Sequence, residues 1–287
     1  MMLRWLLTSY AHQMTRQKIQ ETVAQAWQQV SGEPVARRPA ELPPCDVALI
    51  MSTEVEAEGL VKQLDDKVTT RCASFVEHAG QWCERRVVIA ECGLGAQAIE
   101  RATADVIAMH HPAWVVSAGF AAALAAHLRP GQILMADRVV NPQHREWTVG
   151  LKLEPQVLAQ TKGLHVGRLL SVDRLVHDPE QKLALGETHQ ALAYDMETQA
   201  VAEVCQREKV RFLSIRVISD AVDQRWPPEI EALLDQQSWA GKLGAATGAM
   251  WKRPAWVKDL LALQEQAELA STRLAHFCAG VIPQLTS

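Results

Sequence analysis

Residues 86–118 read RVVIAECGLGAQAIERATADVIAMHHPAWVVSA, and this stretch decides the fold class. An apolar run at 86–91 precedes two glycines, after which apolar residues recur at helical spacing over 96–110. A second short apolar run follows at 114–118. The order strand, helix, strand is typical of a βαβ unit, in which the two strands run parallel.

The same alternation of strands and helices continues on both sides of this unit. Before it, the pattern predicts a strand at 47–51 and a helix from about residue 55 to 64. After it, we expect a helix from Met196 and a long amphipathic helix from about Pro254. Further strands are expected at 132–140, 166–172 and 212–218. The polar, irregular segment 141–165 suits a loop near the site, so we predict an α/β protein with a largely parallel sheet.

The N-terminal residues are expected to lie apart from this domain. Residues 1–30 form a predicted helix rich in Gln, and four prolines make residues 32–44 a linker. The chain is thus divided into an N-terminal helix with its linker, 1–44, and a single α/β domain, 45–287, that ends in the long helix. The first helix could touch a membrane surface, but its Gln-rich polar face favours packing on its own domain or on a second subunit.

Composition and charge argue against several classes of protein. A net charge of -4 without a cluster of Lys and Arg argues against a nucleic-acid partner. The six cysteines form no C-x-x-C or zinc spacing, which indicates buried thiols in the reducing cytoplasm. The ten histidines include no H-E-x-x-H motif, so we expect neither a metal nor another cofactor. The N-terminus lacks a secretory signal, and the most apolar stretch, 114–128, is too short to span a bilayer.

Two carboxylates at element boundaries are the strongest candidates for chemistry. Glu197 stands where a helical pattern begins, and Asp220 follows the apolar strand at 212–218. Open α/β sheets bind ligands at the carboxyl ends of their parallel strands, so both side chains could reach one cleft. In the alternative interpretation, Glu197 only complements the positive end of its helix and Asp220 caps the next element.

Three further segments follow predicted strands and could border the same cleft. In Met51-Ser-Thr-Glu-Val-Glu-Ala-Glu58, three acids occur at a helix start, where acids are also common for electrostatic reasons. The glycines of 92–95 allow a tight turn beside a ligand, but Ala98 replaces the third glycine of a dinucleotide fingerprint. Small residues in 117–124 leave room for a ligand or a helix, and no G-x-S-x-G elbow supports a serine triad.

In this order, the segments resemble the nucleoside phosphorylase and nucleosidase superfamily, especially the methylthioadenosine/S-adenosylhomocysteine nucleosidases. The resemblance covers Cys45 to about Asp223 and rests on Val47-Ala-Leu-Ile-Met-Ser-Thr-Glu-Val-Glu56, Glu91-Cys-Gly-Leu-Gly95, Leu128-Arg-Pro-Gly-Gln-Ile-Leu134, Asp195-Met-Glu197 and Ile218-Ser-Asp220. It implies a three-layer α/β fold, with a mostly parallel mixed central sheet flanked by helices and with extra N- and C-terminal helices. Residues 227–228 and 252–256 are similar to a hopanoid-associated branch, whose members act on adenosyl lipids.

The resemblance also implies an activity, which is hydrolysis of the N-glycosidic bond of a 5'-modified purine nucleoside with adenine as the expected base. It assigns Asp220 to protonation of the purine at N7, Glu56 to activation of water and Glu197 to the ribose hydroxyls. The residues implied to line the pocket are Met196, Ser219, Leu175, Phe120, Gly119 and Gly95. These acids lower the barrier because positive charge develops on the ribose and negative charge on the base. For Asp220 to hold a proton near neutral pH, we expect an apolar strand end with neighbouring carboxylates.

Two departures from the family pattern leave the substrate open. The chain has Gly119-Phe-Ala-Ala-Ala where nucleosidases have Gly-Ser-Ala-Gly-Gly, and Leu175 where an aromatic usually stacks on adenine. A phosphorylase with phosphate as co-substrate is the first alternative, and Arg138 or Arg174 could supply its charge. An adenosyl-lipid nucleosidase and a non-catalytic nucleoside-binding protein are the others. Family members are commonly dimers, so the resemblance implies a homodimer.

Overall fold

A computed structural model describes residues 44–150, 161–225 and 254–285, with side chains in the last range described from residue 264 onward. These residues belong to one unit, Pro43–Ser287. The expected N-terminal helix and, except for Pro44, the expected linker lie outside the described residues. The division of the chain at residue 44 therefore stays a prediction.

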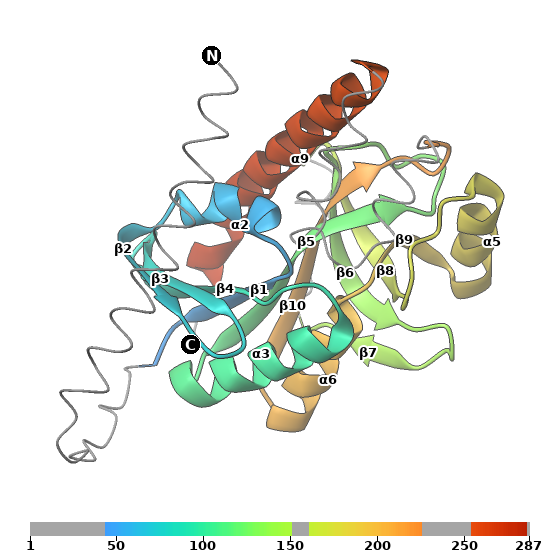
Figure 1. The fold of residues 1–287 in the computed structure, drawn as a ribbon. Coiled ribbons are helices and arrows are strands. Elements are labelled where there is room, and N and C mark those ends of the chain that lie inside the picture. The colour runs from blue at the N-terminus through green and yellow to red at the C-terminus, as the bar shows by residue number, and fades with distance from the viewer. Residues whose placement is uncertain (1–43, 151–160, 226–253, 286–287) are drawn as a thin grey trace, which may run out of the picture. The chain divides into compact units, whose positions relative to one another are not determined.

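A mixed sheet forms the centre of the described unit (Figure 1). Its strands are β1 (Val47–Met51), β2 (Asp65–Arg71), β3 (Val76–Trp82), β4 (Arg85–Glu91), β5 (Trp114–Ala123), β6 (Ile133–Val140), β7 (Glu146–Thr148), β8 (Leu164–Ser171), β9 (Ala191–Asp195) and β10 (Arg211–Asp220). Parallel pairs join β1 to β4 and β5, β5 to β10, and β8 to β6 and β9. Antiparallel pairs join β2 to β3, β3 to β4, β5 to β9, and β6 to β7 and β10. Because β5 contacts both β9 and β10, the strands β5, β10, β6, β8 and β9 close into a barrel.

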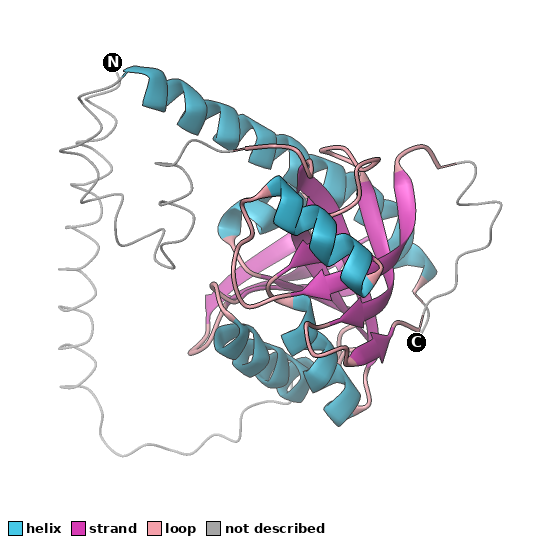
Figure 2. Cartoon of the chain, turned by 90° about the vertical axis from the view of Figure 1, so that its right-hand side faces the viewer, coloured by secondary structure: helices cyan, strands magenta, loops and turns pink. Residues whose placement is uncertain are grey.

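Helices cover both sides of this sheet. They are α2 (Glu54–Val61), α3 (Ala96–His110), α5 (Pro179–His189), α6 (Thr198–Glu208) and α9 (Pro254–Val281), followed by a 3-10 turn at Ile282–Gln284. Figures 1 and 2 show α3 with α6 on one side of the sheet and α2 with α9 on the other, which matches their pairwise packing. None of the described helices is long and apolar enough to cross a membrane.

The strands and helices predicted from strong apolar patterns are observed close to their expected limits. The helix at 96–110 has the expected bounds, and the strand expected at 212–218 is longer by one residue at its start and two at its end. β5 continues through residues 119–123, because residues 119–122 pair with β10 and the last two residues pair with β9. The elements β2, β3, β7, β9 and α5 were not predicted. In β2 every residue is exposed, so it has no apolar pattern to detect.

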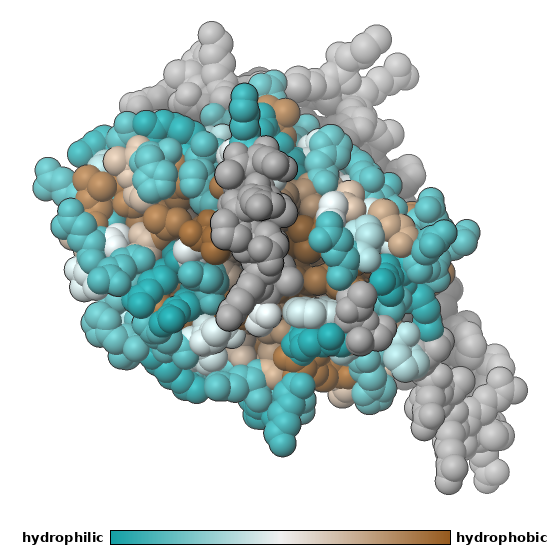
Figure 3. Space-filling view, turned by 180° about the vertical axis from the view of Figure 1, so that it is seen from behind, coloured by the Kyte–Doolittle hydropathy of each residue, from teal (hydrophilic) through white to brown (hydrophobic). Residues whose placement is uncertain are grey.

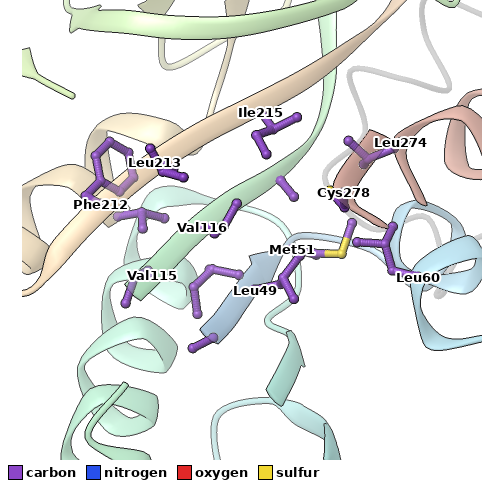
Figure 4. Packing of buried hydrophobic residues seen from close by; sticks show 14 of the residues in the cluster. Leu49, Met51, Leu60, Val115, Val116, Phe212, Leu213, Ile215, Leu274 and Cys278 are labelled. Carbon is purple, nitrogen blue, oxygen red and sulfur yellow. The ribbon is translucent and has the colours of Figure 1, made fainter. Parts of the chain in front are cut away.

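One part of the core lies between the sheet and the pair α2 and α9, and buried residues of α3 and α6 belong to the same hydrophobic cluster. Figure 4 shows Met51 of β1, Leu60 of α2 and Cys278 of α9 close to one another, with Leu274 beside them. Each such fully buried side chain contributes about 1.5–3 kcal/mol through the hydrophobic effect. The intramolecular packing predicted for the C-terminal helix is thus confirmed for the side chains that the structure describes.

The cysteines fall into two groups. Burial raises the pKa of four thiols to about 12, so they stay protonated at neutral pH; they are Cys45, Cys92, Cys205 and Cys278. Cys83 is exposed and Cys72 is partly exposed. The expectation of buried thiols is therefore wrong for these two, which follow the outer strands β3 and β2.

Candidate active site

Strand ends bring the predicted site residues to one edge of the sheet. β1, β4, β5 and β10 are parallel, so their carboxyl ends share an edge. β9 meets β5 only where Ala122 and Ala123 pair with Tyr194 and Ala193, near the carboxyl ends of both strands. The segment after β9, which begins with Met196 and Glu197, therefore starts beside the end of β5. The predicted start of a helix at Glu197 is confirmed, because this residue precedes α6 directly.

Glu56 is held through both of its carboxylate oxygens at the start of α2. Oε2 accepts hydrogen bonds from the backbone N–H of Thr53 (3.0 Å) and from its hydroxyl (3.1 Å), and the Thr53 hydroxyl accepts one from the Glu56 N–H. This reciprocal arrangement is a capping box, which fixes the first turn of the helix. Oε1 accepts a hydrogen bond from the Phe120 N–H (2.9 Å). A carboxylate accepts about four hydrogen bonds, so about one position stays open for water.

The backbone of Gly119 and Phe120 forms a wall beside the Glu56 carboxylate. A Cβ atom at Gly119 would lie 2.7 Å from Glu56 Oε1 and 3.2 Å from Arg216 Nη1, so only glycine permits this close approach. The partly buried side chain of Phe120 packs against the main hydrophobic core. The change from the family's serine to Phe120 therefore leaves the hydrogen bond to Glu56 in place, because the backbone supplies the donor.

A buried cation, Arg216 of β10, organises the acids behind this wall. Its Nε and Nη2 atoms both donate to Asp195 Oδ2, at 2.9 and 2.7 Å. Nη2 also donates to the hydroxyls of Ser117 (2.7 Å) and Thr198 (2.5 Å), and the Thr198 hydroxyl donates to Asp195 Oδ2. Arg216 and Asp195 are both buried, so these hydrogen bonds must offset the loss of hydration. The second oxygen of Asp195, Oδ1, has no hydrogen-bond partner among the described residues. This network ties β5, β9, β10 and α6 together.

Glu197 lies in an acidic environment between these elements. Burial of its carboxyl, followed by the charges of Asp195 and Glu56, raises the pKa of Glu197 from 4.5 to about 8, although Arg216 opposes the shift. Oε2 accepts a hydrogen bond from the Met196 N–H (3.1 Å). The carboxyl therefore holds a proton at neutral pH in the free protein. A protonated carboxyl can donate one hydrogen bond and accept others, which suits a pair of neighbouring hydroxyls.

Asp220 closes β10, as predicted, but its charged neighbour is not the one expected. Lys182 of α5 places its Nζ atom 2.7 Å from Asp220 Oδ2. The Ser219 hydroxyl lies 2.7 Å from Asp220 Oδ1 and 3.2 Å from the carbonyl oxygen of Ala121. We expected an apolar strand end with neighbouring carboxylates. The structure instead shows the ammonium group of Lys182. This neighbour was not expected, because α5 was not predicted from the sequence.

The remaining predicted pocket residues are placed less tightly. Met196 packs against the small apolar cluster that contains Ala122 and Tyr194. Leu175 follows β8 in a loop that is held to β9 by hydrogen bonds between Tyr194 and the backbone of Val176 (3.0 Å each). Gly95 precedes α3 after β4, and a Cβ there would meet no atom within 4 Å. Gly95 is linked to the site only because β4, the strand before it, ends at the same edge of the sheet as β1, β5 and β10.

Three charged residues of this region were not predicted from the sequence, and the two arginines considered for the phosphorylase alternative lie elsewhere. Arg216 interrupts an apolar strand pattern, which was a detectable signal, and Asp195 immediately precedes Met196. Lys182 gave no signal because it belongs to a polar helical segment. Arg138 pairs with the exposed Glu146 of β7 (2.9 Å), and Arg174 is exposed.

Comparisons with known proteins agree with this geometry. The chain matches the family described as Phosphorylase superfamily over residues 46–248. A 5'-methylthioadenosine/S-adenosylhomocysteine nucleosidase of Tolumonas auensis is 26% identical over 211 residues, which cover 66% of this chain and 92% of the relative. The Arabidopsis thaliana 5'-methylthioadenosine nucleosidase in apo form superposes with a TM-score of 0.64 at 18% identity, covering 86% of this chain and 98% of that one. Helicobacter pylori futalosine hydrolase superposes with 0.56 at 19% identity, covering 80% and 95%. The predicted fold class is confirmed, and the chain belongs to the phosphorylase superfamily.

Proposed function

We propose that this chain is a nucleosidase that hydrolyses the N-glycosidic bond of a 5'-modified purine nucleoside, with adenine as the base. The observation that carries the proposal is the acid cluster, by which we mean Glu56, Asp195 and Glu197. Burial of the Glu197 carboxyl, followed by the charges of Asp195 and Glu56, raises the pKa of Glu197. Such a cluster favours the positive charge that develops on a ribose as its base departs. Relatives named 5'-methylthioadenosine/S-adenosylhomocysteine nucleosidases, which are 23–26% identical to this chain, support the same activity.

The reaction divides among residues at the two ends of the site. Asp220 donates a proton to N7 of the purine while the electron pair of the C1'–N9 bond passes to the base, which leaves neutral. A water molecule attacks C1' and gives its proton to Glu56, the acid with an open acceptor position. Glu197 and Met196 bind the ribose, and Ser219, Leu175, Phe120, Gly119 and Gly95 border the pocket. Water is the only co-substrate, so the reaction uses no cofactor.

Hydrolysis is favoured over phosphorolysis by the charge of the site. A phosphorylase must bind a phosphate dianion, for which arginine is the usual partner. Arg216 is the buried arginine beside the acid cluster, and its Nε and Nη2 atoms already bind Asp195, Ser117 and Thr198. The carboxylates around it would repel a second anion.

The test is a screen of nucleosides with release of the free base as its measurement, run with and without phosphate. Adenine, guanine and uracil nucleosides, each with and without a 5'-alkylthio group, cover the substrate classes left open by Leu175. We expect adenine release from the 5'-alkylthio nucleoside without phosphate. Asp220→Asn should lower kcat/KM by about 10²–10⁴-fold, the usual contribution of a general acid. Release that depends on phosphate and yields ribose 1-phosphate would refute hydrolysis.

The proposal extends to a homodimer in the cytoplasm. On the face shown in Figure 3, hydrophobic residues form several patches among hydrophilic ones, which predominate toward the rim. Exposed large hydrophobic residues of the described chain include Val55 beside Glu56 and Leu94 beside Gly95, both at the site edge. A contact there would bring a second subunit to the edge of the site. Sedimentation equilibrium would test this, and a monomer at micromolar concentration would refute it.

A further inference from the structure

Lys182 is the feature of this site that the proposed reaction leaves unexplained. It is only 1% exposed, although lysines are almost never fully buried without a partner. Its side chain extends from α5 to the end of β10 and places Nζ 2.7 Å from Asp220 Oδ2. The two residues, called here the Lys182 pair, stand 38 positions apart in the sequence. The buried ammonium group is therefore compensated by Asp220, the acid that donates the proton in the proposed reaction.

The other oxygen of Asp220 has a partner that can change its role. The Ser219 hydroxyl has one proton but lies within hydrogen-bond distance of two oxygens, Asp220 Oδ1 (2.7 Å) and the carbonyl of Ala121 (3.2 Å). When Asp220 is ionised, Ser219 donates to Oδ1. When Oδ1 carries a proton, Ser219 can donate to Ala121 and accept from Asp220. The site thus accommodates both charge states of Asp220 without movement of the carboxyl group.

We propose that Lys182 is a positioning residue for the proton donor, an inference that rests on the proposed function. By holding Oδ2, Lys182 leaves Oδ1 as the oxygen that carries the proton to the base. In the step itself, the Oδ1–H bond of Asp220 breaks, the N7–H bond of the purine forms, and the electron pair of C1'–N9 goes to the base. The Asp220 carboxylate that remains is stabilised by the ammonium group at 2.7 Å.

A purely structural role predicts different behaviour. A buried ion pair can serve only to fix the packing of α5 against the sheet, and its loss would then affect all substrates alike. A role in proton donation concerns only leaving groups that need a proton. An adenine nucleoside needs one, whereas 4-nitrophenyl riboside releases a stable phenolate without one. The ratio of kcat/KM for these two substrates separates the two roles.

The experiment compares Lys182→Gln with the wild type on both substrates. Gln keeps a hydrogen-bond donor but removes the charge. We expect kcat/KM for the adenine nucleoside to fall about 10²-fold or more, and that for the nitrophenyl riboside to change less than about threefold. Lys182→Arg should restore the adenine activity to within about tenfold of the wild type, because it restores the cation. If Lys182→Gln does not fold, Lys182→Met and Lys182→Arg are compared in the same way.

His110→Gln is the matched control, since it disrupts another buried pair, His110 with Glu77 (2.7 Å), between α3 and β3. It should lower stability and leave the ratio of the two activities unchanged. Equal losses of kcat/KM on both substrates in Lys182→Gln, or no loss on either, would overturn the inference. The proposed function would survive this outcome, because the wild type and Asp220→Asn test it separately. A wild type that releases no base from any nucleoside would reject the proposed function and this inference together.

Discussion

The acid cluster with its neighbour Arg216 and the Lys182 pair both place a buried cation beside carboxylates, but they are built differently. In the acid cluster, Arg216 binds Asp195 through two nitrogen atoms and also reaches two hydroxyl groups. In the Lys182 pair, one nitrogen meets one oxygen, and the second oxygen of Asp220 faces the Ser219 hydroxyl. The first cation is locked by a planar fork, whereas the second is a point charge beside a group that can exchange a proton.

This difference indicates that Arg216 mainly stabilises the structure of the site, whereas Lys182 mainly affects the reaction. Arg216 connects strands and a helix through donors whose geometry leaves little freedom, so its network sets where Glu197 stands. Lys182 constrains only one oxygen of Asp220, which leaves the other available to a ligand. Changes around Arg216 should therefore act first on stability, and changes in the Lys182 pair should act first on the rate of base release.

The largest effect is expected from Arg216→Met. Without the guanidinium group, Asp195 stays buried next to Glu197 with no compensating charge, which should cost about 3–5 kcal/mol of unfolding free energy. Urea unfolding followed by circular dichroism measures this. Arg207→Met is the control, because Arg207 is about half exposed and pairs with Glu100 and Glu208 on the surface. Little change is expected there, and equal losses in the two variants would remove the contrast drawn above.

Glu197→Gln should show the next effect, and it depends on pH. The pKa of Glu197 is raised from 4.5 to about 8, so the folded protein keeps a proton that the unfolded chain releases. The stability of the wild type therefore falls as the pH rises from 4.5 to 8, whereas Gln does not titrate. The melting temperature of the variant relative to the wild type should rise by several degrees across this range. Base release should fall most above pH 8, where Glu197 of the wild type is ionised and Gln supplies no negative charge.

The control for this measurement is Glu265→Gln, at an exposed position of α9. Its melting temperature should follow that of the wild type from pH 4.5 to 8. A difference between Glu197→Gln and the wild type that stays constant over this range would contradict the raised pKa, and with it the electrostatic coupling within the acid cluster.

Local sequence patterns predicted those helices and strands in which one-sided burial gives the apolar residues a regular spacing. The helix at 96–110 and the apolar strands near it follow from their spacing alone. Closure of the barrel could not be predicted, since it depends on pairing of β5 with β9 and of β6 with β10, which no local pattern encodes. β9 has five residues, too few to show a period against its polar neighbours.

The candidate site was more predictable at element boundaries than inside elements. Glu197 and Asp220 stand where one pattern gives way to another, so their type and place were both informative. Lys182 lies within a polar helix, where a lysine is normally taken for a solvated residue. Its burial follows from the packing of α5 on β9 and is a property of the tertiary structure.

The smallest effect is expected from Ser271→Ala, which tests how α9 holds the backbone of Glu56 in place. The buried Ser271 hydroxyl of α9 donates to the carbonyl oxygen of Glu56 (3.0 Å) and accepts from the Gly59 N–H (2.9 Å). Its loss should cost about 1–2 kcal/mol of stability. Base release should fall less than about tenfold, because Thr53 and Phe120 still hold the Glu56 carboxylate. Thr272→Ala is the matched control, since the exposed Thr272 hydroxyl bonds only within α9, to Glu268 (2.9 Å). A large loss of activity in Ser271→Ala at unchanged stability would mean that α9 and not the capping box sets the position of Glu56.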